Sequence, residues 1–193
     1  KNIDREITIQ AIEMVRNQPN FKEQNSTIVY NPDWHKGVVG IVASRLVEAF
    51  YKPTIVLTKS ANGFVSGSAR SITGFDLYEA IEGCADLLEN FGGHTYAAGL
   101  TMKEENLPYF RDRFEKIVTE NITKEVLTPI INIDAQLEFK QITPKFFRLL
   151  NMFQPFGPGN PSPVFLTTSV YDNGNGRVVG GKGAGGGHLK LEL

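Results

Sequence analysis

Residues 54–58, with the sequence TIVLT, constrain the fold more than any other stretch of the chain. An uninterrupted run of this length is typical of a strand that is buried on both faces of a sheet. Apolar residues at helical spacing occur before and after the run, so helices are available to cover the sheet. The order of elements predicts an α/β domain with a mixed sheet over about residues 25–125. We expect strands at 26–30, 54–58, 63–71 and 97–102, and helices at 35–50, 75–91 and 106–122.

The two ends of the chain differ from this α/β region. Residues 1–15 place Ile3, Ile7, Ala11 and Met14 on one helical face, which predicts a helix that continues a longer polypeptide. From residue 126, short apolar stretches alternate with glycine-rich turns, which predicts a small β-barrel that ends before it closes. The expected elements are strands at 129–139, 162–171, 177–180 and 188–193, a helix at 143–153 and a hairpin turn at 172–176.

The charge of the chain excludes a broad basic surface for nucleic acid. Lys and Arg number 20 and Asp and Glu 21, so the formal net charge is −1 and any nucleic-acid contact has to be local.

The single cysteine, Cys84, fits a reducing compartment. No apolar run approaches the roughly 18 residues that a membrane span needs. We therefore expect a cytoplasmic protein without a membrane partner.

The stretch SGSAR, residues 66–70, is the first candidate for chemistry. Side chains alternate along a strand, so Ser68 and Arg70 are expected on one face, and Gly67 and Ala69 on the other. A guanidinium fork matches two oxygens of a phosphate, and a serine hydroxyl adds a donor. The alternative is that Ser68 and Arg70 are ordinary solvent-facing residues of a strand.

The stretch FGGH, residues 91–94, is the second candidate. Gly92 and Gly93 are expected to close the preceding helix in a turn whose N–H groups can approach a phosphate. His94 can donate to a phosphate or to a leaving oxygen, which makes it a candidate for catalytic assistance. The alternative is a helix end followed by a histidine without a special role.

His35 precedes Gly37 near the expected start of a helix, where free N–H groups attract anions. Alternatively, His35 packs under a turn together with Trp34. Because strand and helix ends meet at the edges of a sheet, we predict that His35, Ser68, Arg70 and His94 form one phosphate-binding patch. We expect no catalytic nucleophile and no metal ligand, because the sequence contains no metal-binding cluster, no Ser-His-Asp motif and no P-loop.

Four segments together resemble the RecJ family of bacterial single-stranded-DNA-specific 5′–3′ exonucleases, within the DHH phosphoesterase superfamily. The GGH motif is shared across that superfamily, whereas the PFGPGNPSPVF stretch is more specific to RecJ. The resemblance implies a linker helix at 1–24, a DHH-associated substrate-binding domain at 25–125 and a partial OB-fold β-barrel at 126–193. The segments are residues 34–58, 67–81, 87–102 and 153–165.

The resemblance also implies that cleavage and DNA binding belong to different domains. A DHH domain outside these residues would bind two Mn²⁺ or Mg²⁺ ions and activate water for phosphodiester cleavage in DNA recombination and repair. This chain would bind no metal and would be inactive alone. By motif match, Arg70, Gly92, Gly93 and His94 would contact the DNA backbone, with Ser68 and His35 as weaker candidates. The OB-fold would grip single-stranded DNA.

Two other functions remain open at this point. One is a phosphodiesterase of the same superfamily for short oligonucleotides or cyclic dinucleotides; such relatives generally lack the barrel. The other is a non-enzymatic module in which the barrel recruits single-strand-binding protein. The presence or absence of OB-like strands in residues 128–193 distinguishes a RecJ-like protein from the first alternative. The family joins the last two strands by a short loop, so we assign no function to the glycine-rich residues 180–187.

Overall fold

The computed structural model describes residues 3–157, 159–179 and 188–191. Contacts divide the chain into two compact units between Pro129 and Ile130. The boundaries predicted from the sequence at residues 25 and 126 stay predictions. No helix in the described part of the chain has the length and apolar character that crossing a bilayer requires.

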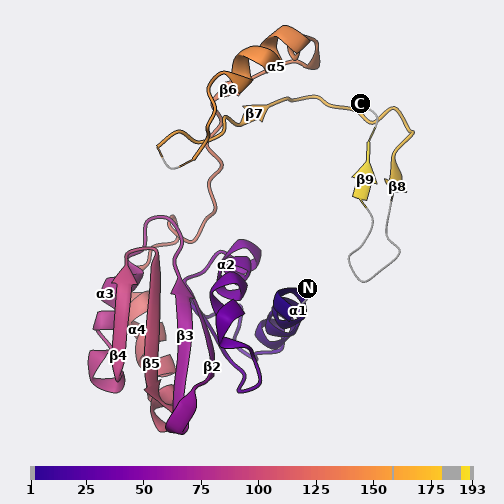
Figure 1. Cartoon of the computed structure of the whole chain (residues 1–193). Helices are drawn as coiled ribbons and strands as arrows, with labels where there is room; N and C mark the ends of the chain where they lie inside the picture. Colours follow the sequence, from indigo (N-terminus) through magenta and orange to yellow (C-terminus); the bar gives the residue numbers. More distant parts are fainter. Residues whose placement is uncertain (1–2, 158, 180–187, 192–193) are drawn as a thin grey trace. The chain divides into compact units, whose positions relative to one another are not determined.

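The first unit contains a five-stranded sheet with the strand order β1-β2-β3-β5-β4 (Figure 1). β1 runs parallel to β2, and the other neighbouring pairs are antiparallel, so the predicted α/β class with a mixed sheet is confirmed. The strands are β1 (Thr27–Tyr30), β2 (Thr54–Lys59), β3 (Phe64–Arg70), β4 (Asn90–His94) and β5 (Ala97–Lys103).

Helices cover both faces of this sheet. On one face Val56 of β2 packs among buried residues of α1 (Ile3–Arg16) and α2 (Val39–Phe50). On the other face Ile55 and Leu57 join a core with α3 (Leu77–Glu82) and α4 (Leu107–Asn121), which lie behind β4 and β5 in Figure 1. β2 is therefore buried on both sides, as the TIVLT run predicted.

The predicted helix at 75–91 is wrong beyond Glu82. α3 ends there, a 3₁₀ turn follows at Ala85–Leu87, and residues 90–94 form β4. A Cβ atom at Gly83 would lie 2.9 Å from the Cδ1 atom of Ile117, so the chain leaves α3 in close contact with α4. The apolar residues after Leu77 are spaced as in a helix because they face the core, but the backbone groups of β4 pair with β5 instead.

The second unit is built from short elements. β6 (Ala135–Gln136) pairs in parallel with β7 (Phe165–Leu166), and β8 (Arg177–Val179) pairs with β9 (His188–Lys190) in antiparallel fashion. α5 (Pro144–Asn151) lies within the predicted helix at 143–153, and its Phe146 ring lies 5.5 Å from the ring of Phe165. The described residues form no closed barrel, and the hairpin expected across 172–176 is not among their strand pairs. The glycine-rich residues 180–187 lie outside the described residues.

Candidate nucleic-acid interface

Arg70 and His94 lie in one row across the sheet, on either side of Ala97. Arg70 of β3 pairs with Ala97 of β5, and Ala97 pairs in turn with His94 of β4. Directly paired residues of antiparallel strands point to the same face, so both side chains leave the sheet on the same side. Neighbouring strands are about 4.8 Å apart, which places the two backbones about 10 Å from each other.

The next row on this face consists of Ser68, Gly99 and Gly92. A Cβ atom at Gly92 would meet nothing within 4 Å, and one at Gly99 would meet only the carbonyl oxygen of Gly67, at 3.8 Å. Gly92 and Gly99 are exposed. We call Ala97, Gly99 and Gly92 the glycine floor. Because Gly92 and Gly99 have no side chains and Ala97 has only a methyl group, another polymer backbone can approach this floor closely.

Helix α2 borders the floor on the side of β3. A Cβ atom at Gly40 would lie 3.0 Å from Nη2 of Arg70 and 3.3 Å from Oγ of Ser68. Ser68 and Arg70 are therefore side by side next to the first turn of α2, as the alternation of SGSAR predicted. On the opposite side β4 is the last strand of the sheet, so one side of its backbone has no strand partner among the described residues.

The guanidinium of Arg70 is available for an anion. Its Nη1 donates to the carbonyl oxygen of Ala69 at 2.8 Å, and none of the ion pairs between described residues includes it. Arg45 and Arg113, by contrast, pair with Asp4 and Asp86. A partly engaged guanidinium keeps several donors for phosphate oxygens.

The two candidate histidines are held in the same way. Nδ1 of His94 accepts a hydrogen bond from the N–H of Tyr96 at 3.3 Å, and Nδ1 of His35 accepts one from the N–H of Gly37 at 3.1 Å. A neutral imidazole whose Nδ1 is an acceptor carries its proton on Nε2. Each exposed ring therefore presents an Nε2–H donor; the sequence predicted a donor at His94 but not which ring nitrogen would donate.

The structure shows where each residue of the predicted patch lies. Ser68, Arg70, Gly92 and His94 share one face of the sheet. His35 lies in the turn that precedes α2, and no hydrogen bond or ion pair among the described residues joins it to the other four.

Gly93 has a structural role that the sequence reading missed. Its φ angle is +154°, and a Cβ atom there would lie 2.2 Å from the carbonyl oxygen of Ala97. The prediction that Gly92 and Gly93 form a turn is wrong, because both belong to β4 and the turn consists of Thr95 and Tyr96. The glycine at position 93 allows β4 to pair closely with β5.

Asp76 anchors this turn. Its carboxylate caps α3 by accepting from the N–H of Glu79 at 3.1 Å, and it also accepts from the hydroxyl of Thr95 at 3.0 Å. The N–H of Leu77 donates to the Thr95 carbonyl at 3.1 Å. The hydrogen bond from Glu79, and to a smaller extent the one from Thr95, lowers the pKa of Asp76. Asp76 therefore stays ionised at neutral pH and holds the turn next to His94.

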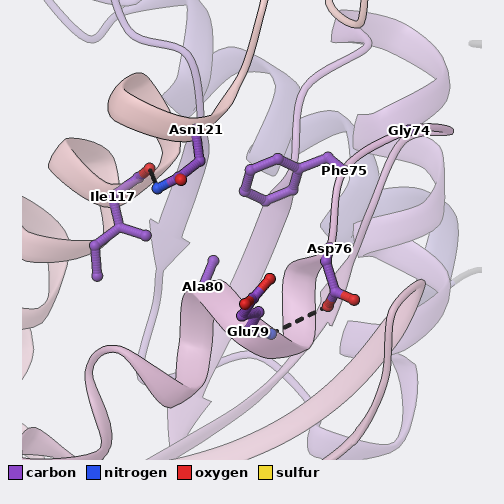
Figure 2. A pocket seen from close by; sticks show the side chains of 7 residues that line it. All are labelled: Gly74, Phe75, Asp76, Glu79, Ala80, Ile117 and Asn121. Atoms are coloured by element: carbon purple, nitrogen blue, oxygen red, sulfur yellow. Dashed lines mark hydrogen bonds between the residues drawn. The ribbon is translucent and has the colours of Figure 1, made fainter.

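A pocket of about 310 Å³ lies beside this anchor (Figure 2). Asp76 and Glu79 contribute carboxylates to it, and Phe75 and Ile117 contribute apolar walls. None of the predicted phosphate-binding residues lines it, and its acidic groups disfavour an anion. No group of three or more His, Cys, Asp or Glu residues that could hold a metal ion occurs in the described ranges.

Family comparisons agree with this arrangement of a sheet domain followed by short strands. The DHHA1 domain model matches residues 23–120, and the RecJ OB domain model matches residues 133–193. The chain therefore belongs to the DHHA1 domain family. The RecJ OB domain that follows places it among the RecJ proteins, and the predicted family is confirmed.

Individual relatives support the same assignment. The chain is 42% identical over 165 residues to the single-stranded-DNA-specific exonuclease RecJ of Bacillus subtilis, covering 85% of this chain and 21% of that protein. It is 32% identical over 197 residues to RecJ of Escherichia coli, covering 99% of this chain and 33% of that one. The chain thus spans between about a fifth and a third of the length of these relatives.

Solved structures show the same likeness. RecJ of Thermus thermophilus in complex with Mg²⁺ matches with a TM-score of 0.80 and 29% identity, over 100% of this chain and 28% of that chain. The corresponding structure in complex with Mn²⁺ matches with a TM-score of 0.78.

Proposed function

We propose that this chain grips the DNA strand for a RecJ-type 5′–3′ exonuclease that acts on single-stranded DNA in recombination and repair. The observation that carries the proposal is the placement of Arg70 and His94 on one face of the sheet, with the glycine floor between them. Two donors separated by small residues suit a phosphodiester chain, whose negative charge is repeated along its length.

Each residue has a defined part in this proposal. Arg70 binds two oxygens of a phosphate through its planar fork, and the hydroxyl of Ser68 adds a donor beside it. His94 donates from Nε2–H, to a phosphate oxygen or to the oxygen that leaves after cleavage. Gly92 lets the DNA strand lie close to the sheet, and Gly93 allows β4 to pair with β5 and so keeps Gly92 in position. His35 belongs to the site only as a weaker candidate at the start of α2.

Cleavage is assigned to residues outside this chain. The T. thermophilus relatives were solved with Mg²⁺ and Mn²⁺, and a divalent metal of this kind would supply the activated water in the whole protein. The residues described here would bind and orient the phosphate. The second unit, which matches the RecJ OB domain, would add a further grip on the strand, and single-strand-binding protein is a second candidate partner for it.

Fluorescence anisotropy with a labelled single-stranded oligonucleotide tests the proposal. We expect weak binding that decreases as salt is added, because it depends on a few phosphate contacts. Arg70→Ala is expected to weaken binding about tenfold, whereas Arg113→Ala, which removes an arginine already paired with Asp86, serves as the matched control. Equal affinities of the Arg70→Ala variant and the unmodified chain would refute the phosphate assignment.

A nuclease assay tests the division of work separately. The chain alone, supplied with Mn²⁺ or Mg²⁺, is expected to leave single-stranded DNA intact. Robust metal-dependent digestion would contradict the assignment of cleavage to residues outside this chain.

A further inference from the structure

Tyr96 is held by its backbone while its ring is left free. It is the second residue of the turn between β4 and β5. Its N–H donates to Nδ1 of His94 at 3.3 Å, and its carbonyl oxygen accepts from the N–H of Ser71 at 3.0 Å. The side chain is 53% exposed, and its hydroxyl makes no hydrogen bond with any described residue. The backbone of Tyr96 is thus fixed by His94 and by Ser71, the residue next to Arg70, while its ring stays exposed.

The ring also lies next to a proposed phosphate donor. The centroids of the His94 and Tyr96 rings are 6.4 Å apart, and the ring planes are inclined by 70°. A tyrosine ring left in water contributes little to folding, since its apolar faces remain unburied. Beside an anion-binding residue, the same ring offers a flat surface on which a nucleobase can stack.

We infer that Tyr96 is a stacking platform for one nucleobase of the bound strand. This inference rests on the proposed function, because the phosphate of the same or the adjoining nucleotide would be held by His94 and Arg70. A sugar links each phosphate to its base, so a donor and a platform side by side can engage one nucleotide together. Stacking uses the face of the base, which every base has, so the contact accepts any sequence. It also requires an unpaired base, which favours single-stranded DNA over a duplex.

Tyr109 provides a control for the nonspecific effect of removing an exposed tyrosine ring from the first unit. Tyr109 is 67% exposed, but it lies on α4, which covers the opposite face of the sheet. Its removal takes away a similar exposed ring at a distance from the glycine floor. A nonspecific effect of losing a surface tyrosine would therefore appear equally in both variants.

Binding to two probes with the same number of phosphates tests the inference. One probe is a short oligothymidylate, and the other is an abasic backbone of the same length. Tyr96→Ala is expected to weaken binding of the oligothymidylate about tenfold, within the range for one stacked base, and to leave binding of the abasic probe unchanged. Tyr96→Phe retains the ring and should bind both probes as the unmodified chain does, and so should Tyr109→Ala.

The possible outcomes separate the inference from the proposed function. Equal loss on both probes in Tyr96→Ala, or no loss on either, would overturn the stacking platform. Arg70→Ala measured on the abasic probe judges the phosphate site alone: unchanged binding there refutes the proposed function. A selective effect of Tyr96→Ala on the oligothymidylate, together with weaker binding of the abasic probe by Arg70→Ala, would support both the platform and the phosphate site.

Discussion

Gly92 and Gly93 are neighbours in β4, yet only Gly92 has room for a side chain. A Cβ atom at Gly92 would meet nothing within 4 Å, whereas one at Gly93 would lie 2.2 Å from the Ala97 carbonyl oxygen. Gly92 belongs to the glycine floor, and the Cβ position of Gly93 lies on the other face of the sheet. The two glycines therefore differ: Gly93 is needed for the pairing of β4 with β5, whereas Gly92 leaves open space for the proposed contact with DNA.

Gly93→Ala is expected to destabilise the first unit. Its φ of +154° is unfavourable for a residue with a side chain, and strain of this kind costs about 1–3 kcal/mol before the clash with Ala97 is counted. Urea denaturation followed by circular dichroism measures the effect. A variant as stable as the unmodified chain would show that β4 can shift without cost.

Gly92→Ala should affect binding and not stability. The free energy of unfolding is expected to change by no more than about 0.5 kcal/mol, because the added methyl group contacts nothing. The methyl group stands on the glycine floor, so affinity for single-stranded DNA should fall in the anisotropy assay. Unchanged affinity would indicate that the strand does not lie on this floor.

Arg70→Lys should separate the charge of Arg70 from its shape. Lysine keeps the positive charge but lacks the planar fork, so binding is expected to weaken at every salt concentration. The slope of log affinity against log salt should remain as in the unmodified chain, whereas Arg70→Ala should reduce that slope by about 1. Full affinity in Arg70→Lys would mean that Arg70 acts as a point charge only.

Asp76→Ala should give a stability difference that depends on pH. Hydrogen bonds from Glu79 and Thr95 lower the pKa of Asp76 in the folded chain below its unfolded value of about 3.9. The stabilisation is therefore fully present above that value and is lost as pH falls through the lower folded pKa. We expect a loss of about 1 kcal/mol at pH 7, typical for a helix cap, and a smaller difference in acid. Urea titrations of both proteins at pH 7 and at about pH 3 measure it; a difference that is constant with pH would exclude the ionised cap.

The thiol of Cys84 is expected to be unreactive in the folded chain. Burial is the main cause that raises its pKa to about 11, and the side chain is fully buried in the core. Little thiolate is then present at pH 8, and a reagent cannot reach it. Reaction with a disulfide reagent at pH 8 should be slow without urea and fast in denaturing urea. Rapid reaction under native conditions would indicate that the core opens around α3.

The sequence predicted those features whose signal is local. The apolar run at 54–58 identified a doubly buried strand, and the alternation of SGSAR placed Ser68 and Arg70 on one face. β4 was missed because its strand character depends on pairing with β5. Its glycines give no side-chain pattern, and the core-facing residues before it are spaced as in a helix.

Other features of the site depend on contacts that no spacing reveals. The orientation of His94 comes from one backbone N–H, and the anchoring of its turn comes from Asp76, which lies 19 residues before Thr95 in the chain. The sequence around Asp76 indicates only an acidic residue near the positive end of a helix. Its link to Thr95 is tertiary and therefore had no local signal.

Gly40 of α2 limits the positions that the Arg70 side chain can adopt, although it lies outside the sheet. With no side chain at this position, the first turn of α2 comes so close that an added methyl carbon would stand 3.0 Å from the guanidinium nitrogen. An alanine at this position is expected to displace the guanidinium of Arg70 from the proposed phosphate site. Gly40→Ala is therefore expected to weaken DNA binding through Arg70, and a comparison of its affinity with its melting curve separates this effect from a loss of stability.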